Sequence, residues 1–317
     1  MPRDAVMFSM SMPPYWHCGR TLLRSSLHTL AALVPAMVMA LWYWGLPALR
    51  VMVLGGGVAV LTEALWCHVM GRKHTVGDCT ALISGLLLAF LLPANAPWWL
   101  VSIGAFVAIS LGKMAFGGLG SNPVNTTLVG WAVLYVSFPL LLNSNAMQLS
   151  TEFVDPLVRL KYFGAEQAAA SPLLDLVLGR QINGLGAGQV GALLLGGLFL
   201  VARGIVRWPV ALGFVLGMSA LVCILNLVDP GSAISPLFHI CTGSTVLGAF
   251  FLATEMANSP VRILPMFFYG LIAGALAMCI RHYGENLDGV PFAILLANML
   301  TPWFDNIRRT PFGGRRS

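Results

Sequence analysis

Charged side chains are scarce in this chain, and their scarcity decides its class. Only 9% of the 317 residues are charged and 57% are apolar, whereas about 25% of the residues in a soluble domain are charged. Such a chain cannot present most of its surface to water, so we interpret it as an integral membrane protein. Its apolar residues form long blocks rather than the alternating segments of about 10 residues that build an outer-membrane barrel, which favours spanning helices.

Motifs of several enzymes and binding proteins are missing as well. The chain has no dinucleotide-binding glycine fingerprint and no phosphate-binding Gly-x-x-x-x-Gly-Lys-Ser/Thr loop. Its six cysteines show no Cys-x-x-Cys spacing, which argues against an iron–sulfur cluster, a thiolate metal site or a disulfide framework. No clustered basic face with interleaved aromatics is visible, so we expect no nucleic-acid binding. We therefore expect no complete redox enzyme in this chain alone.

Ten apolar segments predict membrane-spanning helices, since a helix needs about 20 residues to cross roughly 30 Å of hydrocarbon. They cover residues 26–46, 49–70, 79–93, 97–115, 126–143, 187–203, 207–228, 240–254, 261–280 and 288–305. Five spans per half is an odd number, so a duplicated second half must enter from the opposite side. We therefore predict an all-α polytopic membrane protein, with about ten transmembrane helices in two inverted five-helix repeats at 26–143 and 187–305.

Matching segments in the two halves support this repeat. Cys79-Thr80 opens an apolar run that ends at Ala94-Asn95-Ala96-Pro97, and Cys241-Thr242 opens another that ends at Ala257-Asn258-Ser259-Pro260. Both runs are short for spanning helices. Short segments at corresponding positions of two repeats point to a site at the repeat interface, where half-helix ends offer backbone dipoles to a ligand.

The basic residues predict the orientation of the chain. With the N-terminus in the cytoplasm, 13 of the 18 lysines and arginines fall on the inner side and five on the outer side, as the positive-inside rule expects. Residues 1–25 then form a cytoplasmic segment, 306–317 a basic cytoplasmic tail, and 144–186 an outward-facing link between the repeats. Residues 1–25 lack the apolar stretch of a cleavable signal peptide, so we expect the first span to be the insertion signal.

Four carboxylates inside or at the ends of spans are candidates for an ion or proton pathway. A charge inside a membrane costs roughly 2.5–3.5 kcal/mol even on lenient scales, so such residues mark functional sites by default. Glu63 lies within the second span and Glu255 closes the eighth; the alternatives are a structural carboxyl and an interfacial carboxylate. Asp78 and Asp288 precede apolar runs, where capping of the following helix is the favoured interpretation. We predict a capping or hydrogen-bonding role for His239 and no metal site.

Four motifs carry a resemblance to a known family. They are CTALISGLLLA at 79–89, GGLGSNPVN at 117–125, HICTGSTVLGAFF at 239–251 and DGVPFAILLAN at 288–298. The glycines of the second motif permit positive φ angles, which predicts a tight turn into the fifth span. In their order and spacing, over about residues 10–310, the motifs resemble the D subunit of the Rnf ion-translocating electron-transport complex. The B subunit of the sodium-pumping NADH:quinone oxidoreductase is similar in scaffold.

The resemblance implies a subunit of an ion-motive complex of the bacterial inner membrane that links NADH and ferredoxin. In that family FMN is esterified through its phosphate to a threonine of the outward loop. In the corresponding stretch, 168–173, Ser171 stands where threonine is usual, so Ser171 is the candidate for covalent FMN. The alternatives are a serine that merely precedes a proline at a helix boundary, flavin held noncovalently, and no flavin at all. A second flavin such as riboflavin between the helices is a further open question. The implied partners are other membrane and peripheral subunits of the complex, including a second flavin subunit and iron–sulfur subunits.

Two functional classes stay open at this point. One is an electron-transfer subunit with FMN on its outer face, whose inverted-repeat body contributes to the translocation of sodium ions or protons. The other is a secondary transporter of the inverted-repeat type without a redox role. A transporter predicts several buried ionisable, serine, threonine or asparagine side chains around one central site, whereas a redox subunit predicts a yellow protein that needs partners. The small number of acidic residues inside spans favours the redox interpretation.

Overall fold

The computed structural model describes residues 21–72, 75–142, 155–164, 168, 172–228 and 235–306. Within these ranges every regular element is helical and there is no strand. The predicted all-α class is therefore confirmed for the described part of the chain.

In the first half, residues 21–72 and 75–142 are described, and they contain six α-helices, one short 3₁₀ helix and one π-helical turn. Their bounds are α1 Leu22–Trp44, α2 Leu46–Val69, η1 Val76–Asp78, α3 Thr80–Leu91, α4 Trp98–Ile109, η2 Ser110–Met114, α5 Thr126–Ser137 and α6 Pro139–Leu142. The described parts of the link contain α8 Pro156–Val158, η3 Arg159–Phe163 and α10 Leu173–Val177. The second half comprises α11 Val190–Ala202, α12 Trp208–Val228, α13 Pro236–Cys241, α14 Thr245–Leu247, η4 Gly248–Leu252, α15 Ile263–Tyr283 and α16 Val290–Asn306.

Four of these helices, α1, α2, α12 and α15, are long and apolar enough to cross a membrane. Shorter apolar helices occupy 80–91, 98–114, 126–137 and 190–202. Many large apolar side chains are exposed on the long helices, as Trp42 at 83% exposure illustrates, which fits contact with lipid. The chain is thus a multi-pass membrane protein. The number of ten spans and the inverted repeat stay predictions.

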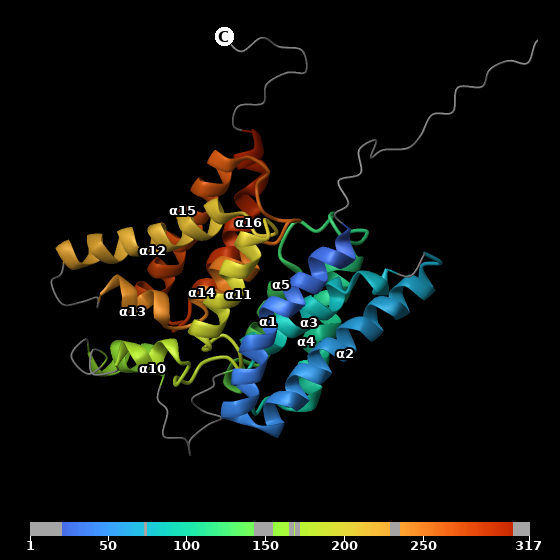
Figure 1. The fold of residues 1–317 in the computed structure, drawn as a ribbon, viewed down its shortest axis with the longest axis horizontal. Helices are drawn as coiled ribbons and strands as arrows, with labels where there is room; N and C mark the ends of the chain where they lie inside the picture. Colours follow the sequence, from blue (N-terminus) through green and yellow to red (C-terminus); the bar gives the residue numbers. More distant parts are fainter. Residues whose placement is uncertain are drawn as a thin grey trace, which may run out of the picture.

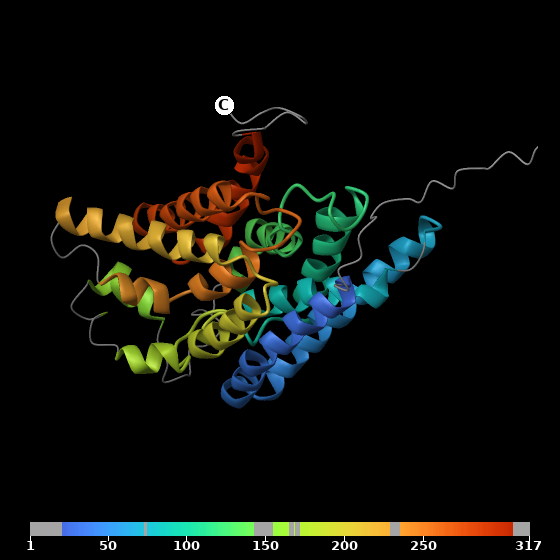
Figure 2. The same cartoon turned by 45° about the horizontal axis from the view of Figure 1, so that its top comes forward.

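The described helices of the two halves lie side by side, blue to green for the first half and yellow to red for the second (Figures 1 and 2). Contacts between α1 and α11 and between α5 and α16 join them. The predicted segment 240–254 is not one helix. Helix α13 ends at Cys241, Thr242 is extended and Gly243 has a φ of +68°, so the helix restarts only at Thr245.

Small residues bring helix backbones close together in both halves. In α12, Gly213 and Gly217 face Gly270 and Gly274 of α15, and a Cβ at any of these four positions would overlap a backbone carbonyl oxygen of the opposite helix. In the first half, Gly55 of α2 and Gly85 of α3 meet in the same way. Lipid is as apolar as the helix side chains, so close packing through glycine replaces the hydrophobic effect as the force that joins the helices.

Candidate functional site

A cavity of about 350 Å³ lies between the two halves. Elements α1, α3, η2 and α5 of the first half form one part of its wall, and α11, η4 and residues 254–257 of the second half form the other. We call it the interface cavity. Its volume falls within the range of roughly 300–1,000 Å³ that is usual for small-molecule sites. The location agrees with the prediction of a site between the two halves.

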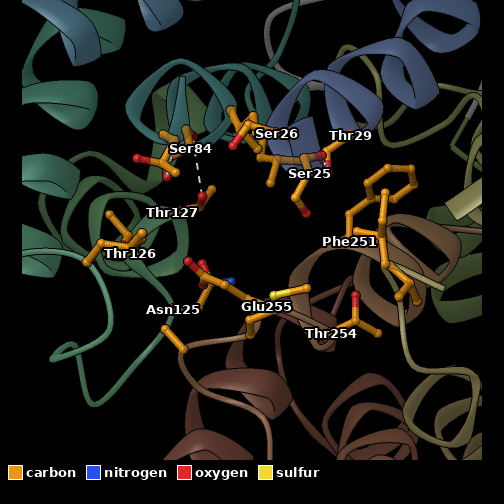
Figure 3. Close-up of a pocket in the computed structure, with 18 of the residues that line it drawn as sticks. Ser25, Ser26, Thr29, Ser84, Asn125, Thr126, Thr127, Phe251, Thr254 and Glu255 are labelled. Carbon is orange, nitrogen blue, oxygen red and sulfur yellow. Dashed lines mark hydrogen bonds between the residues drawn. The ribbon is translucent and has the colours of Figure 1, made fainter. Parts of the chain in front are cut away.

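The interface cavity combines apolar walls with converging hydroxyl groups. Figure 3 shows the hydroxyls around a central opening, with Ser84 and Ser26 across from Thr254 and Glu255. Ser84 donates a hydrogen bond to the Thr80 carbonyl (3.2 Å), and Thr254 donates one to the Phe250 carbonyl. A hydroxyl that donates to its own helix keeps acceptor lone pairs. The cavity therefore offers acceptors to a ligand beside the apolar side chains Ile83, Leu87, Phe250 and Phe251.

Asparagines of the glycine-rich motif fasten the first half to the second. Asn125 caps α5, since its side chain accepts a hydrogen bond from the Leu128 amide (3.1 Å), and it donates another to the Leu252 carbonyl (3.0 Å). Asn122 donates to the side-chain oxygen of Asn258 (3.3 Å). Sequence reasoning assigned these residues only to a tight turn. The turn itself is confirmed, because three glycines of this motif have φ angles between +90° and +114°.

A buried ion pair adjoins the cavity, and its lysine, Lys113, lines the wall. The Lys113 ammonium is 2.7 Å from Oε1 of Glu63, and the two side chains are 4% and 1% exposed. Lys113 also donates to the Thr80 hydroxyl (2.8 Å), and the Thr75 hydroxyl donates to the same Glu63 oxygen. Lys113 sits on η2, a π-helical turn that continues α4; such turns occur frequently at functional sites.

Lys113 is a residue that sequence reasoning missed. In the sequence it counted only among the 13 basic residues assigned to the inner side, and no local pattern pairs it with Glu63. Yet Lys113 lies within the predicted span 97–115. The rule that selected Glu63, an ionisable residue inside a span, therefore contained the signal that could have found its partner.

Glu255 lines the interface cavity on the side of the second half. It lies beyond η4 and accepts a hydrogen bond from the Asn258 side-chain amide (3.0 Å). Burial raises the pKa of this carboxyl to about 7, while the positive charge of Lys113 acts in the opposite direction. Of the four predicted carboxylates, Glu63 thus pairs with the Lys113 ammonium, and Glu255 lines the same cavity and is influenced by its charge.

Asp288 lies in a separate cluster at the break between α13 and α14. Its carboxylate accepts hydrogen bonds from the amides of Ser244 (2.7 Å) and Val290 (3.4 Å) and from the Arg281 guanidinium (3.2 Å). Arg281 also donates to the His239 carbonyl (2.9 Å). The contact with Val290 agrees with the predicted cap of the last helix. The contacts with Ser244 and Arg281 show that Asp288 fastens the helix break as well.

Three other predicted residues have different outcomes. Asp78 is part of η1 and does not cap α3, whose N-cap is Cys79 without a side-chain hydrogen bond; that prediction is wrong because Asp78 lies one residue too early. The buried His239 ring has no hydrogen-bond partner in the described part of the chain, which contradicts the role predicted for it. The described residues contain no group of metal-binding side chains. Ser171 lies outside the described residues.

The sequence is similar to a known family and to several known proteins. Residues 9–313 match the NQR2, RnfD, RnfE family. The D subunit of an ion-translocating oxidoreductase complex from Klebsiella pneumoniae is 33% identical, over 98% of this chain and 100% of the relative. The D subunit of a Na⁺-translocating ferredoxin:NAD⁺ oxidoreductase complex from Acetobacterium woodii is 33% identical, over 96% of this chain and 95% of the relative. The D subunit of an ion-translocating complex from Cronobacter sakazakii is 31% identical, over 98% and 100%.

Proposed function

The chain belongs to the NQR2, RnfD, RnfE family, and on this premise we propose that it is a membrane subunit of an Rnf-type oxidoreductase that carries electrons on bound flavin and takes part in cation translocation. Its similarity to D subunits of such complexes extends over nearly its whole length. The observation that carries the proposal is the interface cavity, whose wall includes Lys113 of a buried ion pair. A redox cofactor and an ion site would then be neighbours.

The interface cavity fits a flavin that has no phosphate. An isoalloxazine ring needs apolar walls and a few converging polar groups, which Phe251, Ile83 and the hydroxyls provide. Among the described residues that line the cavity, the one cation is Lys113, and Glu63 already neutralises it. The donor set therefore suits riboflavin better than FMN. A bound flavin supplies one- and two-electron transfer, while the hydroxyls hold and orient it and the apolar walls limit access of water.

The covalent FMN stays a proposal for the outward link. A serine hydroxyl at Ser171 can form the same phosphoester as the family's threonine. Ser171→Ala should remove the flavin fluorescence from the denatured protein band, whereas Ser171→Thr should keep or increase it. The intact mass of the purified subunit gives an independent reading. A wild-type band without fluorescence, from a subunit without added mass, would refute covalent attachment of FMN at Ser171.

The amount of flavin that acid releases from the purified complex tests whether the interface cavity holds a noncovalent flavin. Ser26 of α1 is 5% exposed and lines the cavity, so Ser26→Leu should fill part of it and reduce the acid-released flavin per complex several-fold. Ser102→Leu on α4 is a matched control, since Ser102 donates only to the Trp98 carbonyl of its own helix and does not line the cavity. Equal flavin content in the two variants would contradict the assignment of this cavity.

The remaining features of the proposal concern ions, partners and orientation. Glu63 and Glu255 are the best placed carriers of a sodium ion or proton, because Glu63 pairs with Lys113 and Glu255 lines the same cavity as Lys113. The names of the relatives indicate a complex of several subunits, and we propose flavin and iron–sulfur subunits among the partners. The basic residues support a place in the cytoplasmic membrane with both termini inside.

A secondary transporter is the second candidate, and one observation favours it. Serine, threonine and asparagine side chains surround a central cavity, which is the pattern that the sequence analysis expected of a transporter. Flavin content decides between the two candidates. A purified complex without acid-released or covalent flavin would favour the transporter.

A further inference from the structure

The buried ion pair leaves one carboxylate oxygen without a partner. Oε1 of Glu63 accepts hydrogen bonds from Lys113 and Thr75, whereas Oε2 is buried and has no hydrogen-bond partner in the described part of the chain. A buried carboxylate with a free oxygen is unusual, because such oxygens are normally satisfied. Glu63 therefore keeps capacity for a second cationic partner.

The Lys113 ammonium occupies a place that suits a dehydrated monovalent cation. It lies between the Glu63 carboxylate (2.7 Å) and the Thr80 hydroxyl (2.8 Å), and both partners offer oxygen atoms. Hard cations such as sodium prefer oxygen ligands. An ammonium is a compact charge on a flexible four-carbon stem, so it can leave these oxygens without movement of the helix.

A second carboxylate, Glu255, lines the same cavity as the ammonium. Lys113 and Glu255 both line the interface cavity, and the Lys113 charge acts on Glu255. Neither carboxylate has another cationic side chain within hydrogen-bonding distance in the described residues. Among the described residues, Lys113 is therefore the one cation that pairs with Glu63 and whose charge also acts on Glu255.

We propose that Lys113 is a tethered competitor of the transported cation: its ammonium neutralises Glu63 while this site is empty, and it moves towards Glu255 when a sodium ion or proton arrives at Glu63. This inference rests on the proposed role in cation translocation. The incoming charge replaces the ammonium at Glu63, and the ammonium becomes the partner of Glu255. Glu63 thus stays neutralised throughout the exchange, which avoids an isolated buried charge away from water, and Glu255 gains a cationic partner when the ion arrives.

A competitor changes the cation concentration at which translocation is half-maximal, and a merely structural ion pair does not. The experiment uses the whole complex in proteoliposomes, with Na⁺ uptake and lumen acidification followed during electron transfer. In Lys113→Met the competitor is gone, so half-saturating Na⁺ should fall at least about 5-fold, and uptake per electron should also fall because nothing expels the ion. For a proton-coupled complex, the pH midpoint of translocation should rise by about one unit or more instead.

Lys113→Arg should strengthen the competitor instead of removing it. This variant also keeps the proposal testable if the complex with Lys113→Met does not assemble. Arginine is charged at any working pH and can hold a carboxylate through two parallel hydrogen bonds, so half-saturating Na⁺ should rise, or the pH midpoint should fall. Lys161→Met is the matched control, because the exposed Lys161 donates to the carbonyls of Gly284 and Glu285 and does not line the interface cavity.

The outcomes separate this inference from the function on which it rests. A wild-type complex that transfers electrons but moves neither ion would refute the proposed cation translocation. A wild-type complex that moves a cation, with unchanged half-saturation in both Lys113 variants, would leave that function in place and refute the competitor. Opposite shifts in Lys113→Met and Lys113→Arg support it, and shifts in the same direction overturn it.

Discussion

Replacing Asp288 tests whether this carboxylate is a fastener or part of an ion pathway. Asp288→Asn keeps the shape of the side chain but removes its charge and replaces one acceptor oxygen by an NH₂ donor. All three present partners, the amides of Ser244 and Val290 and the guanidinium of Arg281, are donors. The new amide group must therefore face a donor on one side, and Arg281, whose side chain is 3% exposed, loses its charged partner.

The magnitude follows from the exposure of the pair. Removal of one partner from a buried ion pair costs about 3–5 kcal/mol, and the Asp288 side chain is 20% exposed, which places the expected cost near the lower end, at about 3 kcal/mol. For domains of about 150–250 residues, 1 kcal/mol changes the melting temperature by about 2–4 °C. The complex that carries Asp288→Asn should therefore melt about 6–12 °C below the wild type in a thermal scan followed by tryptophan fluorescence.

Asp78→Asn is the control for this measurement. Asp78 is half-exposed and makes no side-chain cap to α3, so its replacement should change stability by less than about 0.5 kcal/mol. If Asp288→Asn melts within about 2 °C of the wild type but loses cation uptake, the carboxylate belongs to the ion pathway and the fastening role is wrong.

Two further predictions concern packing and pH. Gly217→Ala should destabilise the protein by about 1–3 kcal/mol, because the new Cβ overlaps the Leu271 carbonyl. Gly57→Ala is the control and should be neutral, because its Cβ would enter open space. Equal melting temperatures of the two variants would contradict the close packing of α12 on α15. The raised pKa of Glu255, about 7 against 4.5 for an ordinary glutamate, means that the folded state binds an extra proton between these values, so its stability falls as pH rises through this window. Glu255→Gln should remove that slope in thermal scans between pH 4.5 and 8, and a slope that persists would contradict the assignment.

The sequence predicted the class and the positions of the helices well, because both depend on local composition. The apolar segment 207–228 became α12, Trp208–Val228, and 49–70 became α2, Leu46–Val69. The prediction was poorest where the helix breaks, as in 240–254. An apolar run specifies burial, but the break at Thr242 depends on Gly243 and on partners distant in sequence, such as Arg281 and Asp288.

The sequence predicted single residues of the site but not their contacts with one another. Glu63 and Glu255 were selected one by one as ionisable residues near spans, but the ammonium that acts on both comes from a third segment, 50 residues from Glu63 in sequence. Asn122 and Asn125 belonged to a recognisable turn, yet their contacts with Asn258 and Leu252 cross between the halves. Pairings of this kind are tertiary, and no local pattern encodes them.

Arg281 and Lys113, two buried cations of the described chain, differ in how many groups hold them. At a helix break inside a membrane, backbone and hydroxyl oxygens must be satisfied within the protein. Arg281 contacts the carbonyls of His239 and Thr242, the Thr245 hydroxyl and Asp288, so its planar guanidinium is held from several sides. Within the described residues, the Lys113 side chain donates hydrogen bonds to Glu63 and Thr80 alone, and it borders a cavity. Fewer partners and adjacent space make Lys113 the cation that can move, and they make Arg281 the one that keeps the break closed.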